Sequence, residues 1–245
     1  MSGLSEKFSN SAITKFFDTA LAGESKTYND HNWYTSGGLR GYIEGRNSSP
    51  YSLLKKDLTK YTIGEIQQFQ DRGRDSKGQL WATGRYQIIP DTLDGLLKKA
   101  NINSSDKYNE ENQNKLGLQL LANRSSIRKY ITQEIADTKE NLESASLSMA
   151  KIWASIGVPY TMKGRYGTIQ KNQSYYAGGG DKASESTEEV QKALKDLRNS
   201  YGKKKFSIKE SLKGGKKGKI VLYSVIGLSV LGIGIGIFYY FKTKK

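Results

Sequence analysis

An uncharged segment of 22 residues, 220–241, stands near the end of this 245-residue chain. As a helix it would be about 33 Å long, because each residue of an α-helix rises ~1.5 Å. The hydrocarbon core of a bilayer is ~30 Å thick. The segment therefore predicts a transmembrane helix, and a long buried helix of a soluble domain is the less favoured alternative.

Tyrosines and glycines within this segment fit a membrane setting. Tyr223 lies near one end and Tyr239 and Tyr240 near the other, as in the aromatic belts of membrane proteins. Gly232 and Gly236 are four residues apart, a spacing that lets two membrane helices approach closely. The alternative is that membrane helices simply tolerate glycine. The prediction is a lipid partner, with helix–helix association through these glycines left open.

Lysines flank the apolar segment on both sides. Residues 202–219 hold eight lysines and one glutamate, and three more lysines follow in 242–245. Because basic residues gather on the cytoplasmic side of membrane proteins, the larger cluster predicts that residues 1–219 stay there. The N-terminus lacks the basic and then apolar pattern of a secretory signal, so we expect a tail-anchored protein. Its parts would be a domain at 1–201, a lysine-rich linker at 202–219, the membrane helix and a basic tail.

The composition excludes several kinds of chemistry. The net charge is +15, which indicates an anionic partner such as nucleic acid, phospholipid or bacterial wall. The lysine-rich linker is most simply a tether attracted to anionic lipid, and a nucleic-acid partner is the less favoured interpretation. Cysteine is absent and His31 is the single histidine, which argues against disulfides, thiol nucleophiles and metal sites. We therefore expect carboxylate chemistry without a cofactor or metal.

Residues 1–201 are expected to form short helices with one glycine-rich insertion, a mainly α (α+β) fold. Thr62 with Glu65 and Ser186 with Glu189 have capping-box spacing, and Pro90 can begin a helix. Residues 32–45 alternate aromatic residues with glycines and predict a β-hairpin. The expected apolar helix faces are Ile13, Phe16, Phe17, Ala20 and Leu21; Ile63, Ile66 and Phe69; Leu93, Leu96 and Leu97; Ile127, Tyr130, Ile131 and Ile135; Leu142, Ala145, Met149, Ile152, Trp153 and Ile156; and Val190, Ala193, Leu194 and Leu197.

Glu24 continues the apolar face that begins at Ile13. Desolvation at the end of such a face would raise the pKa of the Glu24 carboxyl group, as a general acid needs. The alternative is that Gly23 ends the helix and turns Glu24 into solvent as an ordinary surface charge. Periodicity alone leaves both interpretations open.

Five segments in a fixed order carry a resemblance to a known family. They are AGESKTYNDHN (22–32), TIGEIQQFQ (62–70), ATGRYQIIPDTL (82–93), AKIWASIGVP (150–159) and SYYAGGGDKA (174–183). Together they resemble the lysozyme-like superfamily of peptidoglycan-cleaving enzymes, especially phage muramidases and lytic transglycosylases. The resemblance spans roughly residues 10–200 and implies a lysozyme-like fold with a small β-hairpin.

The resemblance also implies roles for individual residues. Glu24 would be the catalytic acid at the end of the first helix. The substrate-binding residues implied are Tyr28 and Asn29, which follow the acid; Gly84, Tyr86 and Gln87, which match a Gly-x-Tyr-Gln segment lining the cleft; and Tyr175 and Tyr176, which match an aromatic pair near the acid. Lys26 and Thr27 depart from the glycine-rich sequence of many relatives, which leaves the local loop geometry open.

Cleavage of a glycosidic bond requires a proton donor and stabilisation of an oxocarbenium-like transition state. Hydrolysis by the usual routes needs a second carboxylate, roughly 5 to 5.5 Å away for retention or 6.5 to 9.5 Å for inversion. Asp30 and Glu44 are the nearest candidates in sequence, and the alternative for Asp30 is to cap a turn. If neither serves, the resemblance implies the lytic transglycosylase route, in which one glutamate acts as acid and then as base while the muramic acid 6-hydroxyl closes a 1,6-anhydro ring.

The leading hypothesis is a membrane-anchored phage enzyme that cleaves the β-1,4 bond between N-acetylmuramic acid and N-acetylglucosamine during host wall penetration or lysis. Its partners would be peptidoglycan glycan strands and a lipid membrane, either the virion membrane or the host inner membrane. The alternative is a non-catalytic wall-binding protein or a basic structural membrane protein of a virion.

Overall fold

The structure is a computed structural model of the whole chain. It describes residues 4–25, 27–34, 40–43, 54–71, 80–165, 167–178, 182–202, 227–229 and 232–234. The chain divides into two compact units, Met1–Lys205 and Phe206–Lys245, and each is considered separately. Glu44 and Lys26 lie outside the described residues, as does most of 202–219, 220–241 and 242–245.

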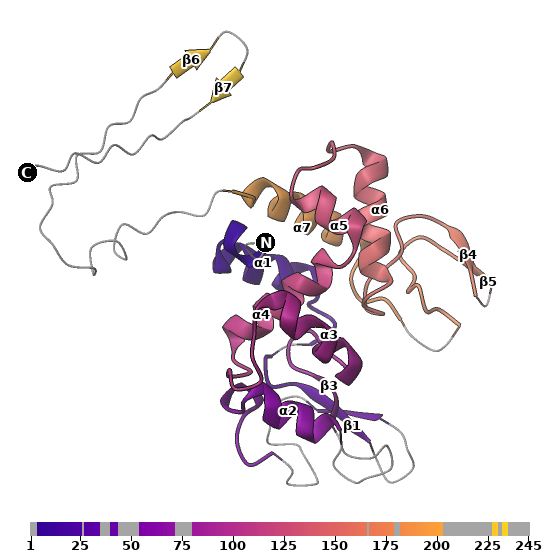
Figure 1. The fold of residues 1–245 in the computed structure, drawn as a ribbon. Helices are drawn as coiled ribbons and strands as arrows, with labels where there is room; N and C mark the ends of the chain where they lie inside the picture. Colours follow the sequence, from indigo (N-terminus) through magenta and orange to yellow (C-terminus); the bar gives the residue numbers. More distant parts are fainter. Residues whose placement is uncertain are drawn as a thin grey trace, which may run out of the picture. The chain divides into compact units, whose positions relative to one another are not determined.

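The first unit is mainly helical with small antiparallel sheets, which confirms the predicted α+β class (Figure 1). Its α-helices are α1 (Asn10–Ala20), α2 (Ile63–Gln70), α3 (Pro90–Ala100), α4 (Glu110–Ala122), α5 (Ser125–Ile131), α6 (Lys139–Ala150) and α7 (Thr187–Ser200). Short 3-10 helices occupy Leu4–Lys7 and Leu58–Lys60. The strands are β1 (His31–Tyr34), β2 (Arg40–Ile43), β3 (Leu80–Thr83), β4 (Met162–Gly164) and β5 (Gly167–Ile169).

The helix starts follow the signals in the sequence. Thr62 and Ser186 each form a capping box with the glutamate three residues later, so two predicted helix starts are confirmed. α3 begins at Pro90, as expected. Helix α6 is shorter than predicted, because it ends at Ala150 and leaves Ile152 and Trp153 in the following turns.

The predicted hairpin is present and belongs to a larger sheet. β1 pairs antiparallel with β2, and β3 pairs with the other edge of β1, which gives the order β2-β1-β3. β1 begins one residue after Asp30, so the first helix leads into the sheet through a single loop of residues 21–30. That loop carries Glu24.

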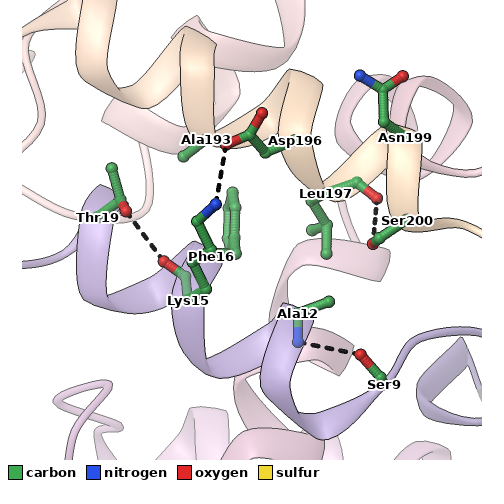
Figure 2. A pocket seen from close by; sticks show the side chains of 10 residues that line it. All are labelled: Ser9, Ala12, Lys15, Phe16, Thr19, Ala193, Asp196, Leu197, Asn199 and Ser200. Carbon is green, nitrogen blue, oxygen red and sulfur yellow. Dashed lines mark hydrogen bonds and ion pairs between the residues drawn. The ribbon is translucent and has the colours of Figure 1, made fainter.

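Helices α1 and α7 pack side by side and in opposite directions. They flank a groove of about 330 Å³ in which Lys15 pairs with Asp196 across 3.6 Å (Figure 2). Phe16 and Leu197 are buried at this contact. Because the helices are antiparallel, the C-terminal end of α1 meets the residues that precede α7.

The core joins distant parts of the first unit. The Phe17 ring on α1 lies 4.3 Å from the Tyr86 ring and 6.4 Å from the Trp153 ring, centroid to centroid. Trp153 is buried, which confirms its predicted core position. Its Nε1 donates to the Tyr86 carbonyl oxygen across 3.2 Å, so the core also fixes the backbone of the Gly84–Gln87 turn.

In the second unit, six residues of the predicted membrane helix are described, and they are not helical. Gly227–Ser229 (β6) pairs antiparallel with Gly232–Gly234 (β7). Three of these six residues are glycines, which have poor helix propensity. Among the described residues, no helix has the length and apolar character needed to cross a membrane. The remainder of 220–241 is outside the described part of the chain.

Candidate active site

Glu24 lies in a turn beyond the end of α1. The helix ends at Ala20, and the Glu24 N–H donates to the Leu21 carbonyl oxygen across 3.1 Å. The predicted apolar face of α1 is buried through Leu21, whereas the Glu24 side chain is half-buried. Glu24 therefore does not continue the buried apolar face of α1, and it is not a fully exposed charge either. The turn, rather than the helix, determines where its carboxyl group lies.

One side of this turn packs against the residues that precede α7. A Cβ atom on Gly23 would lie 2.7 Å from Ser184 Cβ and 2.9 Å from Glu185 Oε1, so only glycine allows this approach. The Glu185 carboxylate therefore lies against Gly23. Glu185 is 9% exposed. Burial, followed by the charge of Glu189, raises the pKa of Glu185 above its usual value.

Glu185 is not among the predicted site residues, although one feature of the sequence points to it. Glu185 immediately precedes Ser186, the N-cap of α7. That position is often occupied by an apolar residue that packs against the first turn of the helix. An acidic residue there, buried beside a glycine, is an exception that needs an explanation.

The other side of the turn is held by Asp30, which is fully buried. Its Oδ2 accepts hydrogen bonds from Ser25 Oγ and the Thr27 N–H, each across 2.9 Å. Its Oδ1 accepts from Thr27 Oγ1 across 2.6 Å. Both carboxylate oxygens are thus engaged within the loop. These contacts are those of a turn-capping aspartate, the alternative that the sequence left open for Asp30.

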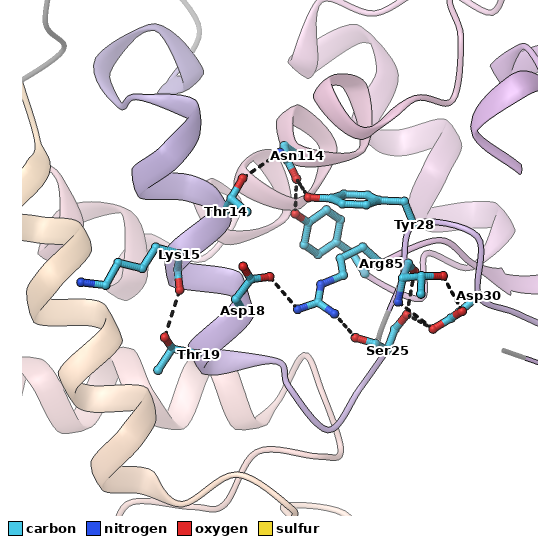
Figure 3. A network of polar contacts seen from close by, with 11 residues as sticks. Thr14, Lys15, Asp18, Thr19, Ser25, Tyr28, Asp30, Arg85 and Asn114 are labelled. Carbon is cyan, nitrogen blue, oxygen red and sulfur yellow. Dashed lines mark hydrogen bonds and ion pairs between the residues drawn. The ribbon is translucent and has the colours of Figure 1, made fainter. Parts of the chain in front are cut away.

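Arg85 connects α1 to the same loop (Figure 3). Its guanidinium group is buried and donates to Asp18 Oδ1 across 2.9 Å and to the Ser25 carbonyl oxygen. The Arg85 N–H donates to Gln113 Oε1 across 2.9 Å. Arg85 occupies the unspecified position of the Gly-x-Tyr-Gln pattern, so the pattern predicts no role for it.

Two tyrosines that were predicted to bind substrate meet at Asn114. Tyr28 donates its hydroxyl hydrogen to Asn114 Oδ1 across 3.0 Å (Figure 3). The Tyr86 hydroxyl donates to the same oxygen. Tyr86 is 1% exposed, and burial raises the pKa of its hydroxyl group. The Tyr86 ring packs against Gly117, where a Cβ would come within 2.9 Å of it. The expected position of Tyr86 in a cleft lining is therefore corrected to one in the core.

Gly84 and Gln87 shape the turn between β3 and α3. Gly84 has φ +73°, and its N–H donates to the Asp30 carbonyl oxygen across 2.7 Å. Gln87 also has positive φ, and its Nε2 donates to the Gly84 carbonyl oxygen across 2.9 Å. Gln87 Oε1 is buried and has no hydrogen-bond partner in the described part of the chain. The turn is thus attached directly to the loop that carries Glu24.

Asn29 attaches the loop to the 3-10 helix at Leu58–Lys60. Its Oδ1 accepts the Thr59 N–H across 3.2 Å, and its carbonyl oxygen lies 3.0 Å from His31 Nδ1. His31 is buried rather than at the surface. Burial lowers its pKa, against the opposing effects of the Asn29 carbonyl and the Asp30 charge. The described residues contain no group of three or more potential metal ligands.

Tyr175 and Tyr176 form a perpendicular pair with centroids 5.4 Å apart. The Tyr176 hydroxyl donates to the Lys151 carbonyl oxygen across 2.8 Å, and Lys151 Nζ lies 5.3 Å from the Tyr175 ring centroid. Tyr176 is 41% exposed. An exposed aromatic face of this kind can stack on the apolar side of a sugar ring.

The tyrosine pair is linked to the Glu24 turn through residues 155–158. The Val158 N–H donates to the Gln173 carbonyl oxygen across 2.8 Å, and the Gly157 N–H donates to the Glu185 carbonyl oxygen across 3.0 Å. The structure therefore brings Tyr28, Asn29, Asp30, Gly84, Tyr86 and Gln87 together on one side of the Glu24 turn, and links Tyr175 and Tyr176 to its other side. Glu44 is outside the described residues.

This architecture is a mainly helical α+β unit in which a half-buried glutamate sits between a helix and a three-stranded sheet. No protein-family model matches the chain. No curated protein and no solved structure matches it significantly either.

Proposed function

We propose that this chain cleaves the β-1,4 bond between N-acetylmuramic acid and N-acetylglucosamine in peptidoglycan, with Glu24 as the general acid. The observation that carries the proposal is the place of Glu24, half-buried in a turn anchored on both sides and followed at once by a small antiparallel sheet. A general acid must be held within reach of the leaving oxygen in a partly desolvated site. The five sequence segments that resemble lysozyme-like enzymes support the same assignment and the lysozyme-like fold.

A lytic transglycosylase mechanism suits the contacts of Asp30 better than hydrolysis does. Asp30 uses both carboxylate oxygens to cap its own loop, so it is poorly placed to activate water or to attack the sugar. In the transglycosylase route, Glu24 donates its proton to the leaving oxygen as the bond from C1 breaks. The 6-hydroxyl oxygen of the muramic acid then bonds to C1 and returns a proton to Glu24. This route needs one carboxyl group and no water.

The substrate surface would include exposed groups around the turn rather than Tyr86. Tyr176 offers an exposed ring, and Lys151 beside Tyr175 provides a positive charge for the carboxylates of muramyl peptides. Tyr28, Asn29, Gly84 and Gln87 would act by fixing the loop. Glu44 remains a proposed second carboxylate for the hydrolytic alternative.

We also propose that residues 220–241 attach the enzyme to a lipid membrane, with 202–219 as a cationic tether. The support is in the sequence, namely 22 uncharged residues preceded by eight lysines. In this arrangement the enzyme would belong to a phage and reside in its virion membrane or in the host inner membrane. Co-flotation of the full chain with anionic liposomes tests the attachment, and full-length protein that stays at the bottom of the gradient would refute it.

The enzymatic proposal is tested by mass spectrometry of the soluble products from purified peptidoglycan. The native full chain, Glu24→Gln and the control Glu110→Gln would be compared, because Glu110 is an exposed carboxylate on α4. We expect 1,6-anhydro-muropeptides from the native chain and the control, and none from Glu24→Gln at unchanged thermal stability. Reducing-end products that depend on Glu24 would indicate a hydrolase. Absence of products from the native chain would refute the proposal and favour a wall-binding or structural role.

A further inference from the structure

The β4–β5 hairpin has one buried face and one exposed face. Side chains alternate between the two faces of a strand. Met162 and Ile169 are paired across the hairpin, and both pack against the core. A Cβ on Gly164 would lie 2.7 Å from Ile169 Cγ1, so the Ile169 side chain lies over the bare backbone of Gly164. Since Ile169 is 3% exposed, this contact fixes which face of the hairpin points inward.

The opposite face of the hairpin, called the outer face below, is polar. It carries Thr161, Lys163 and Arg165 from one side of the hairpin and Thr168 and Gln170 from the other, and all five are exposed. Lys163 and Thr168 are directly paired. Thr161 Oγ1 donates to Gln170 Oε1 across 3.0 Å, which places both side chains on this face.

The base of the hairpin is anchored to the first residue of α7, the buried Thr187. The Thr187 hydroxyl donates to the Val158 carbonyl oxygen across 2.8 Å, and the Thr187 N–H donates to Asn172 Oδ1 across 2.8 Å. The Asn172 N–H in turn donates to the Val158 carbonyl oxygen across 3.0 Å. The hairpin is therefore held firmly where the chain continues into Tyr175 and Tyr176.

The outer face belongs to a stretch of sequence without acidic residues. Residues 144–180 contain four basic residues and no Asp or Glu. One of the four, Lys171, forms an ion pair with Glu188 on α7 across 2.5 Å. Lys163 and Arg165 are the basic residues of the outer face, and the described residues place no carboxylate on that face. This surface is therefore suited to an anionic partner.

We propose that the outer face of the β4–β5 hairpin binds the peptide stems of peptidoglycan through their carboxylate groups. This inference rests on the proposed function, because it assigns a second surface for the same substrate. Peptide stems carry free carboxylates as well as amide groups. Lys163 and Arg165 supply cations for the carboxylates. Thr161, Thr168 and Gln170 supply hydrogen-bond donors and acceptors for the amides.

The mixture of groups favours a peptide over a phosphate-bearing surface. Anionic lipids and nucleic acids are bound mainly by clustered cations, whereas the outer face combines two cations with three uncharged hydrogen-bonding side chains. Peptide stems branch from the glycan strand, so a surface that binds them is needed beside the one that binds sugar. Residues 170–174 join the hairpin directly to Tyr175 and Tyr176, the pair proposed to contact the sugar.

The test is lysine-acetylation footprinting by mass spectrometry on the full chain in detergent, with Glu24→Gln so that the probe is not consumed. Three probes are compared: purified peptidoglycan, the same peptidoglycan after its carboxylates have been converted to carboxamides, and mixed micelles that contain phosphatidylglycerol. Lys98, an exposed lysine on α3, is the internal control. Because each lysine is measured separately, the lysines of 202–219 do not obscure the result at Lys163.

We expect peptidoglycan to protect Lys163 from acetylation, the other two probes to leave it unprotected, and Lys98 to be unaffected throughout. Lys163→Gln combined with Arg165→Gln should raise the Kd for peptidoglycan about threefold to tenfold in co-sedimentation at low salt. Lys98→Gln combined with Lys99→Gln removes the same charge from α3 and should leave the Kd unchanged.

Three results would overturn the inference. They are equal protection of Lys163 by native and amidated peptidoglycan, protection by the lipid micelles alone, and a Kd of the hairpin double variant equal to that of the α3 double variant. Failure of the proposed function would look different, because it would appear as absence of cleavage products from the native chain or as cleavage retained in Glu24→Gln. Protection of Lys163 without cleavage would refute the enzyme and support the outer face as a wall-binding surface.

Discussion

Replacing Gly84 by alanine should weaken the fold at the point where the β3–α3 turn meets the Glu24 loop. Gly84 has φ +73°, a conformation that a Cβ atom disfavours. A Cβ built there would also lie 2.8 Å from the Cδ atom of Gln113 and closer still to its Oε1. Gln113 is fully buried, so it cannot move aside without losing its own contacts.

The cost can be estimated from these two effects. A left-handed conformation costs a non-glycine residue roughly 1–2 kcal/mol. Displacing Gln113 would break hydrogen bonds with the Arg85 N–H and with the Tyr28 and Tyr108 carbonyl oxygens. A buried polar group left without its partner costs about 1–3 kcal/mol. Gly84→Ala should therefore lower the free energy of unfolding by about 2–5 kcal/mol, a large share of the 5–15 kcal/mol typical of a domain.

Urea unfolding followed by circular dichroism measures this change. Gly95→Ala is the matched control, because nothing lies within 4 Å of a Cβ at Gly95 inside helix α3. That substitution should raise the free energy of unfolding by up to about 1 kcal/mol, the difference in helix propensity. If the free energy of unfolding of Gly84→Ala lies within about 1 kcal/mol of that of the native chain, the backbone strain and the Gln113 contact do not have the expected cost.

Two further predictions concern charges near the same loop. Asp18→Asn should lower the free energy of unfolding by about 2 kcal/mol, because the buried Arg85 guanidinium loses its carboxylate partner; a urea midpoint equal to that of the native chain would contradict this. His31 should titrate below its ordinary pKa of 6.5 because burial lowers it, which its single imidazole NMR signal would show. Since the unfolded chain then binds the proton more tightly, the contribution of His31 to stability is complete above pH 6.5 and is lost as the pH falls through the folded pKa.

Features encoded by local sequence were predictable. The capping boxes that begin at Thr62 and Ser186 need only residues three positions apart, and both are formed. The buried face of α1 follows from its 3.6-residue period. Helix α4 was not predicted, because its inner side includes the buried polar residues Gln113 and Asn114, which conceal the apolar pattern.

The arrangement of the candidate site depends on contacts between residues far apart in the sequence, which no local sequence pattern can predict. The helical period places Glu24 on the apolar face of the first helix, but α1 ends at Ala20 and Glu24 lies in the turn that follows. Tyr86 looked like a cleft residue in its motif, yet Phe17 and Gly117 enclose its ring. Arg85 bonds to the loop and Glu185 packs against it at Gly23, each from 60 or more residues away in sequence. Such long-range partners become visible only when the chain is folded.

The Glu24 loop has no regular secondary structure of its own, so its geometry depends on anchors supplied by the rest of the unit. Arg85 holds it through the Ser25 carbonyl and Asn114 through the Tyr28 hydroxyl. Glu185 packs against it at Gly23. Loss of one anchor would leave the helices and the core in place, because core packing supplies most of the stability. The direction of the Glu24 carboxyl group would nevertheless change, and displacements of about 1 Å can reduce catalysis a hundredfold. Variants at these anchors should therefore lose activity before they lose the fold, which separates the proposed catalytic role of the loop from a purely structural one.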